Sequence, residues 1–143
     1  MFWDSSALVP VLLSEARSAE MIALLRKDAA PAIWWGSPVE CQSALQRRRR
    51  EALLSAPALA DALARLGRLA EDVDVVAPST PLRDAAGRAL AAHPLRAADA
   101  LQLAAAVVWS GEASGEAFVC LDDRLRDAAR REGFDVLPAD RRA

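Results

Sequence analysis

Short, continuously apolar runs alternate with segments of helical spacing along this chain, and this order constrains the fold more than any other feature. The runs lack the polar-apolar alternation of half-exposed strands, and helix-length segments separate them. Strands of this kind belong to parallel sheets whose two faces are covered by helices. We expect strands within residues 1–4, 30–37, 72–78, 116–123 and 134–138. The sequence therefore predicts an α/β fold with a central parallel sheet.

Length and composition are those of one globular domain. The chain has 143 residues, of which 53% are hydrophobic and 27% are charged. A chain of this size buries a core without disulfides or a structural metal. The formal net charge of −2 provides no global basic field, so nucleic-acid binding would need a local patch. We expect a single domain over residues 1–143.

The cysteines and the hydropathy pattern bear on the compartment. Cys41 and Cys120 form no CxxC motif and have no neighbouring histidine, which favours two buried thiols in a reducing compartment. No run approaches the ~18 consecutive apolar residues of a membrane span, and the first residues lack the pattern of a signal peptide. We expect a cytoplasmic protein without membrane association.

Acidic residues stand near the ends of the expected strands. Asp4 ends the first run, Asp122 ends the fourth, and Glu40 lies in the first turn of the helix after the second. In the apolar segment "RAADALQLAAAVVW", Asp99 and Gln102 are the polar interruptions, and a buried carboxylate is costly unless something pairs with it. Ligands of open parallel sheets bind beyond the carboxyl ends of the strands. The four acids are therefore expected to converge on one cleft.

Convergent carboxylates predict a metal-dependent chemistry. Crowded carboxylates repel one another unless divalent cations compensate their charge. Oxygen ligands without His or Cys suit Mg²⁺ or Mn²⁺. Two such ions about 4 Å apart activate a water and stabilise the leaving oxygen of a phosphodiester. Phosphodiester hydrolysis is the reaction that these acids favour.

Four stretches of the chain resemble the acidic motifs of one enzyme family. They are "MFWDSSALV" at the start, "SPVECQSAL" around residue 40, "HPLRAADALQLAAA" around residue 99 and "FVCLDDRL" around residue 122. In order, spacing and chain length they are similar to the motifs of PIN-domain ribonucleases, and specifically of VapC-type toxins of type II toxin-antitoxin systems. The resemblance extends from residue 1 to about residue 137.

This resemblance implies a PIN-like three-layer α/β/α sandwich and an endoribonuclease that depends on Mg²⁺ or Mn²⁺ and acts as the toxin of a toxin-antitoxin pair. It implies a cognate antitoxin and a homodimer beside the RNA substrate. It implies a catalytic quartet of Asp4, Glu40, Asp99 and Asp122, in which Asp4, Asp99 and Asp122 bind metal and Ser6 is an accessory residue.

Three positions depart from the pattern of the resembled family. Cys120 stands where that family often has Thr or Ser, and Gln102 stands where it often has His. Asp123 occupies a position that is often basic. Gln102 is a further accessory candidate, and Asp123 is either a fifth acid in the site or the N-cap of the helix that follows.

Each acid also has a structural interpretation. Asp4 could cap the end of a strand, and Asp99 could face the dipole of its helix. Glu40 could complete a capping box that begins with Ser37 as N-cap and Pro38 at the first helical position. Four independent caps would have no reason to match four motifs in order, so we favour the catalytic interpretation.

Four consecutive arginines follow the second motif on the same expected helix. They are Arg47, Arg48, Arg49 and Arg50. They either hold RNA phosphates beside the acids or form a solvated face with an Arg47–Glu51 pair. We favour the solvated face.

Two adjacent tryptophans, Trp34 and Trp35, could stack on RNA bases. Adjacent side chains of a strand point to opposite faces, however, and a sheet covered on both sides buries both. We therefore expect both tryptophans in the core.

Other functions fit the sequence less well. A Ser-His-Asp triad would need His93, the one histidine, which is expected in a loop. A phosphoacceptor receiver domain needs a lysine at its site, whereas Lys27 lies within a helix, and a DxD phosphatase needs Asp where Ser6 stands. The main alternative is a PIN-like module that binds RNA or protein with weak or no catalytic activity.

Overall fold

The computed structural model describes residues 1–111 and 115–139, which contain a five-stranded parallel sheet in the order β3-β2-β1-β4-β5. The strands are β1 (Phe2–Trp3), β2 (Ala32–Trp34), β3 (Asp74–Val76), β4 (Ala117–Val119) and β5 (Asp135–Leu137). Each lies within a run that the sequence predicted. The strand order changes direction between β1 and β4, and open parallel sheets bind ligands beyond the carboxyl ends of the strands at such a point.

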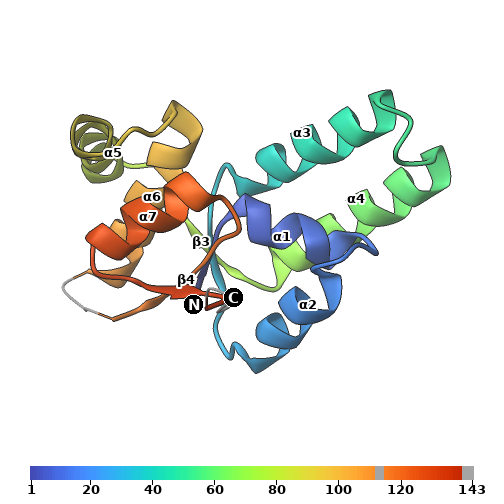
Figure 1. Cartoon of the computed structure of the whole chain (residues 1–143), viewed down its shortest axis with the longest axis horizontal. Helices are drawn as coiled ribbons and strands as arrows, with labels where there is room; N and C mark the ends of the chain where they lie inside the picture. Colours follow the sequence, from blue (N-terminus) through green and yellow to red (C-terminus); the bar gives the residue numbers. More distant parts are fainter. Residues whose placement is uncertain (112–114, 140–143) are drawn as a thin grey trace.

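Helices cover both faces of this sheet, as Figure 1 shows. The described residues form α1 (Ser5–Leu12), α2 (Ser18–Lys27), α3 (Ser37–Arg50), α4 (Ala56–Glu71), α5 (Thr80–Ala92), α6 (Ala97–Ser110) and α7 (Asp123–Arg131). Helices α1 to α4 lie on one side of the sheet and α5 to α7 on the other. The predicted three-layer α/β/α sandwich is confirmed.

Consecutive strand residues fill two separate cores. Phe2 points toward α5, α6 and α7 and stacks on Phe118 with ring centroids 5.6 Å apart. Trp3 points to the other side and packs with residues of α1, α2, α3 and α4. This is the alternation of side chains along a strand, and it explains why the strands are apolar at every position. The predicted burial of Cys41 and Cys120 as free thiols is also confirmed.

The start of α3 differs from the predicted capping box. The N-cap is Gly36, which makes no side-chain cap hydrogen bond, and Ser37 is the first helical residue. The Ser37 hydroxyl instead contacts Gln102, and the Glu40 carboxylate accepts from Ser5. The predicted cap was wrong because contacts with distant residues occupy both of its polar side chains.

The prediction for the tryptophan pair holds for one residue only. Trp34 is buried, whereas Trp35 is 60% exposed. Strand β2 ends at Trp34, so Trp35 lies in the connection to α3 and is not covered by either helix layer. The two indoles meet edge to face, with centroids 6.3 Å apart.

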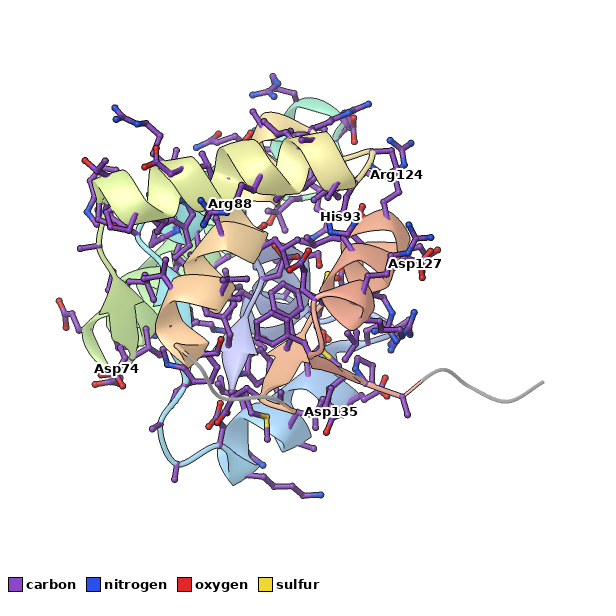
Figure 2. The ribbon with its side chains drawn as sticks, turned by 90° about the vertical axis from the view of Figure 1, so that its left-hand side faces the viewer. Asp74, Arg88, His93, Arg124, Asp127 and Asp135 are labelled. Carbon is purple, nitrogen blue, oxygen red and sulfur yellow. The ribbon has the colours of Figure 1, made fainter. Side chains whose placement is uncertain are left out.

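His93 lies between helices, as predicted, but is buried. It is the C-cap residue of α5 and lies beside α7 in Figure 2. Its Nε2 is 2.7 Å from Oε1 of Glu132, which follows the end of α7. Its role is therefore a contact between these two helix ends. Within residues 1–111 and 115–139, no helix combines the length and the apolar character needed to cross a membrane.

Candidate active site

The carboxyl ends of the central strands place Asp4 at the base of the site. Asp4 directly follows β1, and its backbone N–H donates to Val119 O of β4 at 3.0 Å. Its side chain caps α1 by accepting from the Ser6 backbone N–H at 2.9 Å, and it also accepts from the Ser6 hydroxyl. The Cys120 thiol donates to the same oxygen, Oδ2, at 3.5 Å. Asp4 is only 3% exposed. Its carboxylate thus accepts from three donors, namely the Ser6 N–H, the Ser6 hydroxyl and the Cys120 thiol.

The Ser6 hydroxyl also connects the two central strand ends. Its oxygen accepts from the Leu121 backbone N–H at 2.8 Å and lies 3.6 Å from the Cys120 sulfur. Ser6 therefore links the start of α1 to the segment after β4. Ser6 therefore lies beside Asp4, and its accessory role stays a prediction.

Glu40 reaches the site from the first turn of α3. Its Oε2 accepts a hydrogen bond from the Ser5 hydroxyl at 2.9 Å. Ser5 is the first residue of α1, so the contact joins the N-terminal turns of two helices on the same face of the sheet. The Glu40 carboxylate therefore contacts the residue that directly follows Asp4, and α3 has no side-chain cap.

Asp99 enters from the opposite layer, in the first turn of α6. It is partly buried, and one helical turn further Gln102 is fully buried against Ser37 of α3. Helix α6 is otherwise apolar on its buried side. Asp99 and Gln102 thus stand where helices from the two layers meet.

A pocket of about 340 Å³ brings acids from both layers together. Its lining residues are Ser5, Ser6, Val9, Glu40, Ser43, Ala44, Arg47 and Asp99. Asp4 is not a lining residue but contacts Ser6, which is one. Of the four predicted acids, Glu40 and Asp99 therefore share this pocket, whereas Asp122 is not part of its lining.

Burial and mutual repulsion act on the three acids around the pocket. Burial raises the pKa of Asp4, against the hydrogen bonds from Ser6 and Cys120, and the Asp99 charge raises it further. Burial also raises the pKa of Glu40, opposed by contacts with Gln102 and Ser5 and reinforced by Asp4 and Asp99. These carboxylates lie close enough together to interact as like charges.

Burial and neighbouring charges act in opposite directions on the pKa of Asp99. Burial raises its pKa, and the neighbouring Asp122 carboxylate adds to that effect. A backbone hydrogen bond at Arg96 and the positive charges of Arg96 and Arg124 lower it. The Arg124 charge of α7 and the Arg96 charge at the start of α6 therefore both act on the Asp99 carboxylate.

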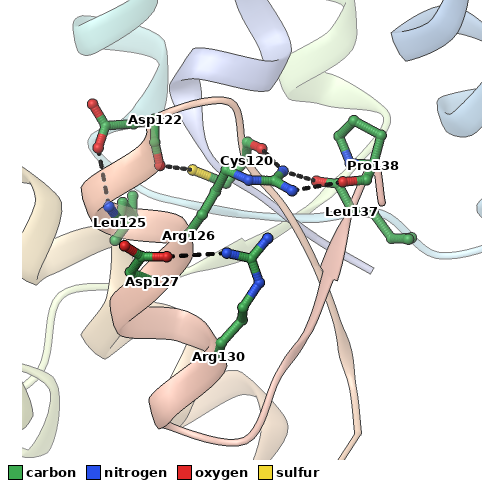
Figure 3. Close-up of polar contacts among 8 residues, drawn as sticks. All are labelled: Cys120, Asp122, Leu125, Arg126, Asp127, Arg130, Leu137 and Pro138. Carbon is green, nitrogen blue, oxygen red and sulfur yellow. Dashed lines mark hydrogen bonds and ion pairs between the residues drawn. The ribbon is translucent and has the colours of Figure 1, made fainter. Parts of the chain in front are cut away.

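Asp122 has a different environment from the other members of the predicted quartet. It is exposed, and its Oδ1 accepts from the Leu125 backbone N–H at 3.0 Å, so that Asp122 caps α7 (Figure 3). Asp123, the first residue of α7, is not the N-cap. That interpretation of Asp123 was wrong because the cap belongs to its neighbour.

The thiols near the site are protonated donors. Burial, followed by the charges of Asp4 and Glu40, raises the pKa of the Cys41 thiol to about 12. Burial and Asp4 likewise raise the pKa of Cys120. Cys120 therefore offers a hydrogen to Asp4, as the hydroxyl of Ser or Thr would.

The donor chemistry of the pocket fits a hard divalent cation, although its geometry is open. Among the residues that the structure describes, no three His, Cys, Asp or Glu side chains are grouped closely enough to hold an ion between them. Asp4, Asp99 and Asp122 are therefore not assembled as a three-ligand cage. Mg²⁺ commonly keeps several waters and uses only one or two carboxylates together with substrate phosphates, so the arrangement is compatible with such an ion.

The four arginines of α3 have different surroundings. Arg47 lines the acidic pocket. Arg48 instead forms an ion pair with Glu15, with Nη2 3.0 Å from Oε2. Arg49 and Arg50 are exposed, and the described residues show no Arg47–Glu51 ion pair. The exposure of three of the four arginines agrees with the favoured solvated face, although its expected Arg47–Glu51 pair is not formed among these described residues, and a contact with RNA stays a prediction.

Sequence reasoning missed several supporting residues. Ser5 was not singled out, although Asp4 as an N-cap would place it in the first turn of a helix. Arg126 was missed too: its buried guanidinium donates to the carbonyls of Cys120, Leu137 and Pro138 at 2.7, 3.3 and 2.7 Å (Figure 3). No local pattern identifies either contact.

Comparisons with known proteins agree with this architecture. PAE2754 from Pyrobaculum aerophilum superposes with a TM-score of 0.67 and 20% identity over 95% of this chain and 87% of its own. A toxin-antitoxin complex from Klebsiella pneumoniae contains a chain with a TM-score of 0.64 and 17% identity, over 94% of each chain. VapC20 from Mycobacterium tuberculosis, a toxin that cleaves the sarcin-ricin loop, gives 0.67 and 20%, over 89% of this chain and 93% of its own.

These structural likenesses, all at or below 20% identity, concern the fold. No curated protein is detectably similar to this chain in sequence. The model of the PIN domain family, however, matches residues 1–131, which is most of the chain. Together with the parallel sheet and the acidic pocket at its carboxyl edge, this match shows that the chain belongs to the PIN domain family.

Proposed function

We propose that this chain, one PIN domain over residues 1–143, is an endoribonuclease that depends on Mg²⁺ or Mn²⁺ and hydrolyses RNA phosphodiester bonds. The observation that carries the proposal is the pocket at the carboxyl edge of the sheet, which Glu40 and Asp99 line and where the charges of Asp4, Glu40 and Asp99 interact. Three carboxylates that repel one another bind cations. The PIN family match supports the same activity.

The residues of the pocket have distinct proposed roles. Asp4, Asp99 and Asp122 would be the oxygen ligands, and Glu40 would complete the quartet as a base or as a ligand to bound water. A divalent ion, when bound, supplies charge compensation and an activated water. Ser6 and Cys120 hold Asp4 in place. Asp123 is exposed beside this quartet.

Arg47 is the proposed contact for the RNA backbone. It lines the same pocket as Glu40 and Asp99, and an arginine beside the acids can pair with a phosphate adjacent to the cleaved bond. Arg48 is already paired with Glu15. Arg49 and Arg50 lie further along the exposed end of the helix and would contribute through long-range attraction.

We also propose that the protein is the toxin of a toxin-antitoxin pair. Two of its structural relatives are a toxin that cleaves the sarcin-ricin loop and a toxin-antitoxin complex. The chain covers more than nine tenths of the length of each of these relatives. The corresponding partners are a structured RNA, an antitoxin protein and a second copy of the chain. A cytoplasmic location remains a prediction.

Cleavage of structured RNA by the purified protein tests the enzymatic proposal. We expect cleavage with Mg²⁺ or Mn²⁺ and none in EDTA. Asp4→Asn should abolish cleavage while the protein stays folded, because asparagine is also a good N-cap. The control is Asp74→Asn, which removes an exposed carboxylate from the edge strand β3. Undiminished cleavage in EDTA would contradict the metal dependence, and no cleavage under any condition would favour a PIN-like binding module.

Growth assays test the toxin proposal separately. Expression of the chain should arrest growth, and co-expression of a neighbouring antitoxin gene should relieve the arrest. Asp4→Asn should not arrest growth. Equal arrest with and without the neighbouring gene product would contradict the regulatory proposal but not the nuclease activity.

A further inference from the structure

A fully buried polar contact joins the two helix layers beside the acidic pocket. The Gln102 Nε2 of α6 lies 2.9 Å from the Ser37 Oγ of α3, and both side chains are fully buried. The residues are 65 positions apart in the sequence. A buried amide and hydroxyl satisfy each other here, which polar groups in a core require.

The contact uses the Ser37 side chain, which by its sequence position would be expected to cap α3. Serine at the start of a helix, three residues before glutamate, normally caps the helix backbone. Here α3 begins without a side-chain cap, Ser37 faces Gln102, and Glu40 faces Ser5. Local rules are most often overridden at functional sites. The loss of the cap is a second observation that points to this contact.

Helix geometry relates the buried pair to the acids. Residues three apart lie on the same side of a helix, about one turn from each other. Gln102 is three residues after Asp99 on α6, and Ser37 is three residues before Glu40 on α3. The contact thus holds the two helices together one turn from each acid, and Gln102 also contacts the Glu40 carboxylate itself. Movement at the contact would change the separation of the two carboxylates.

We propose that Gln102 is a positioning residue, which fixes the separation of Glu40 and Asp99 by holding the first turn of α3 against α6. The role does not require Gln102 to touch metal or RNA. Its effect on ion binding rests on the proposed function, whereas its effect on the carboxylate separation does not. Residues that orient the ligands of a metal typically change its affinity by 10- to 100-fold when they are removed.

A double substitution tests the role without leaving the Ser37 hydroxyl unpaired, and Glu40, which also loses its contact with Gln102, keeps the Ser5 donor. Gln102→Leu alone leaves the Ser37 hydroxyl without a partner and lowers stability, whereas replacing both partners by apolar groups is nearly neutral. The test protein therefore carries Gln102→Leu and Ser37→Ala. The control is Leu103→Met, a volume-conserving change at a fully buried position of the same helix. Thermal unfolding without metal establishes that the two proteins have comparable stability.

Two measurements follow on these proteins. The Mn²⁺ concentration that gives half of the thermal stabilisation, and half of maximal RNA cleavage, should rise about tenfold in the double variant and stay unchanged in Leu103→Met. Crystal structures should show a changed Glu40–Asp99 separation in the double variant only. An unchanged separation together with an unchanged Mn²⁺ requirement would overturn the positioning role. If the wild-type protein neither binds Mn²⁺ nor cleaves RNA, the proposed function fails, and the crystallographic separation still decides the role of Gln102.

Discussion

The Ser5 hydroxyl donates to Glu40 Oε2 at 2.9 Å, across 35 residues of sequence. This bond ties the first turn of α1, which follows the central strand, to the first turn of α3. Asp4 immediately precedes Ser5, so the tripeptide Asp4-Ser5-Ser6 contains one acid and the residues that hold two. Asp4 is held by Ser6, and Glu40 is held by Ser5.

Ser5→Ala should lower kcat/KM for RNA cleavage by about tenfold, since a hydrogen bond to a charged group contributes roughly 1.5–3 kcal/mol. The Glu40 carboxylate would lose one of its two side-chain donors, keeping only Gln102, and would be held less firmly. Ser110→Ala, which removes a hydroxyl at the far end of α6, is the control. Equal kcat/KM in Ser5→Ala and Ser110→Ala would mean that Glu40 needs no such support.

Arg47→Ala should weaken RNA binding and reduce its salt dependence. Loss of one phosphate contact lowers the slope of log K against log salt by about 0.7–0.9. Arg50→Ala, at the exposed end of the same helix, should change the slope less. The measurement is RNA affinity of the Asp4→Asn background, which does not cleave, over a range of salt concentrations. Identical slopes for the two arginine variants would argue against a specific phosphate contact at the pocket.

Asp99→Asn should have opposite effects on stability and function. In EDTA the substitution removes a charge that burial and Asp122 disfavour, so the variant should melt at the same temperature as wild type or higher. In Mg²⁺ only the wild type should gain fully, by roughly 2.7 kcal/mol at a hundredfold excess over Kd. RNA cleavage should be lost. Equal destabilisation in both buffers with retained activity would show that Asp99 is a structural first-turn acid.

Stability without metal should fall as the pH rises above the ordinary range of a carboxyl. Burial raises the pKa of Asp4 and Asp99 above 3.8 in the folded protein, so the folded state binds these protons more tightly than the unfolded state. Their contribution is therefore largest below the ordinary pKa and is lost as the pH rises through the raised values. Melting in EDTA between about pH 4.5 and about pH 7 measures it. Asp99→Asn should show a smaller decrease than Asp74→Asn, and equal decreases would contradict the assignment.

Arg126→Met should destabilise the fold by about 3 kcal/mol, because it removes the guanidinium donor from the buried carbonyls of Cys120 and Pro138, after the ends of β4 and β5. The Leu137 carbonyl also loses Arg126 but keeps the Cys120 backbone N–H as a donor. Arg130→Met is the matched control, since it disrupts an exposed pair with Asp127 on the same helix (Figure 3), worth less than about 1 kcal/mol. Urea unfolding measures both. Equal losses would mean that the Arg126 contacts add nothing beyond a surface ion pair.

Sequence by itself determined the order of the elements and where the candidate acids stand within them. Strands buried on both faces are apolar at every position, and helices repeat apolar residues on one side, so both leave local signatures. Asp4 after β1 and Asp99 in the first turn of α6 could be located from those signatures alone. The position of an acid relative to a strand end is a property of near neighbours in the chain.

The tertiary structure alone decided which partners those side chains have. Ser37 and Glu40 match a capping box in the sequence. In the structure, however, Ser37 pairs with Gln102 and Glu40 pairs with Ser5, which are 65 and 35 residues away. Trp35 matches a buried strand position, but β2 ends one residue earlier and leaves the indole exposed. A capping rule describes competition within one helical turn, whereas a folded domain brings distant donors and acceptors into that competition. Where burial makes an unpaired polar group costly, the side chain pairs with the distant residue. That residue can be identified only from the packed structure.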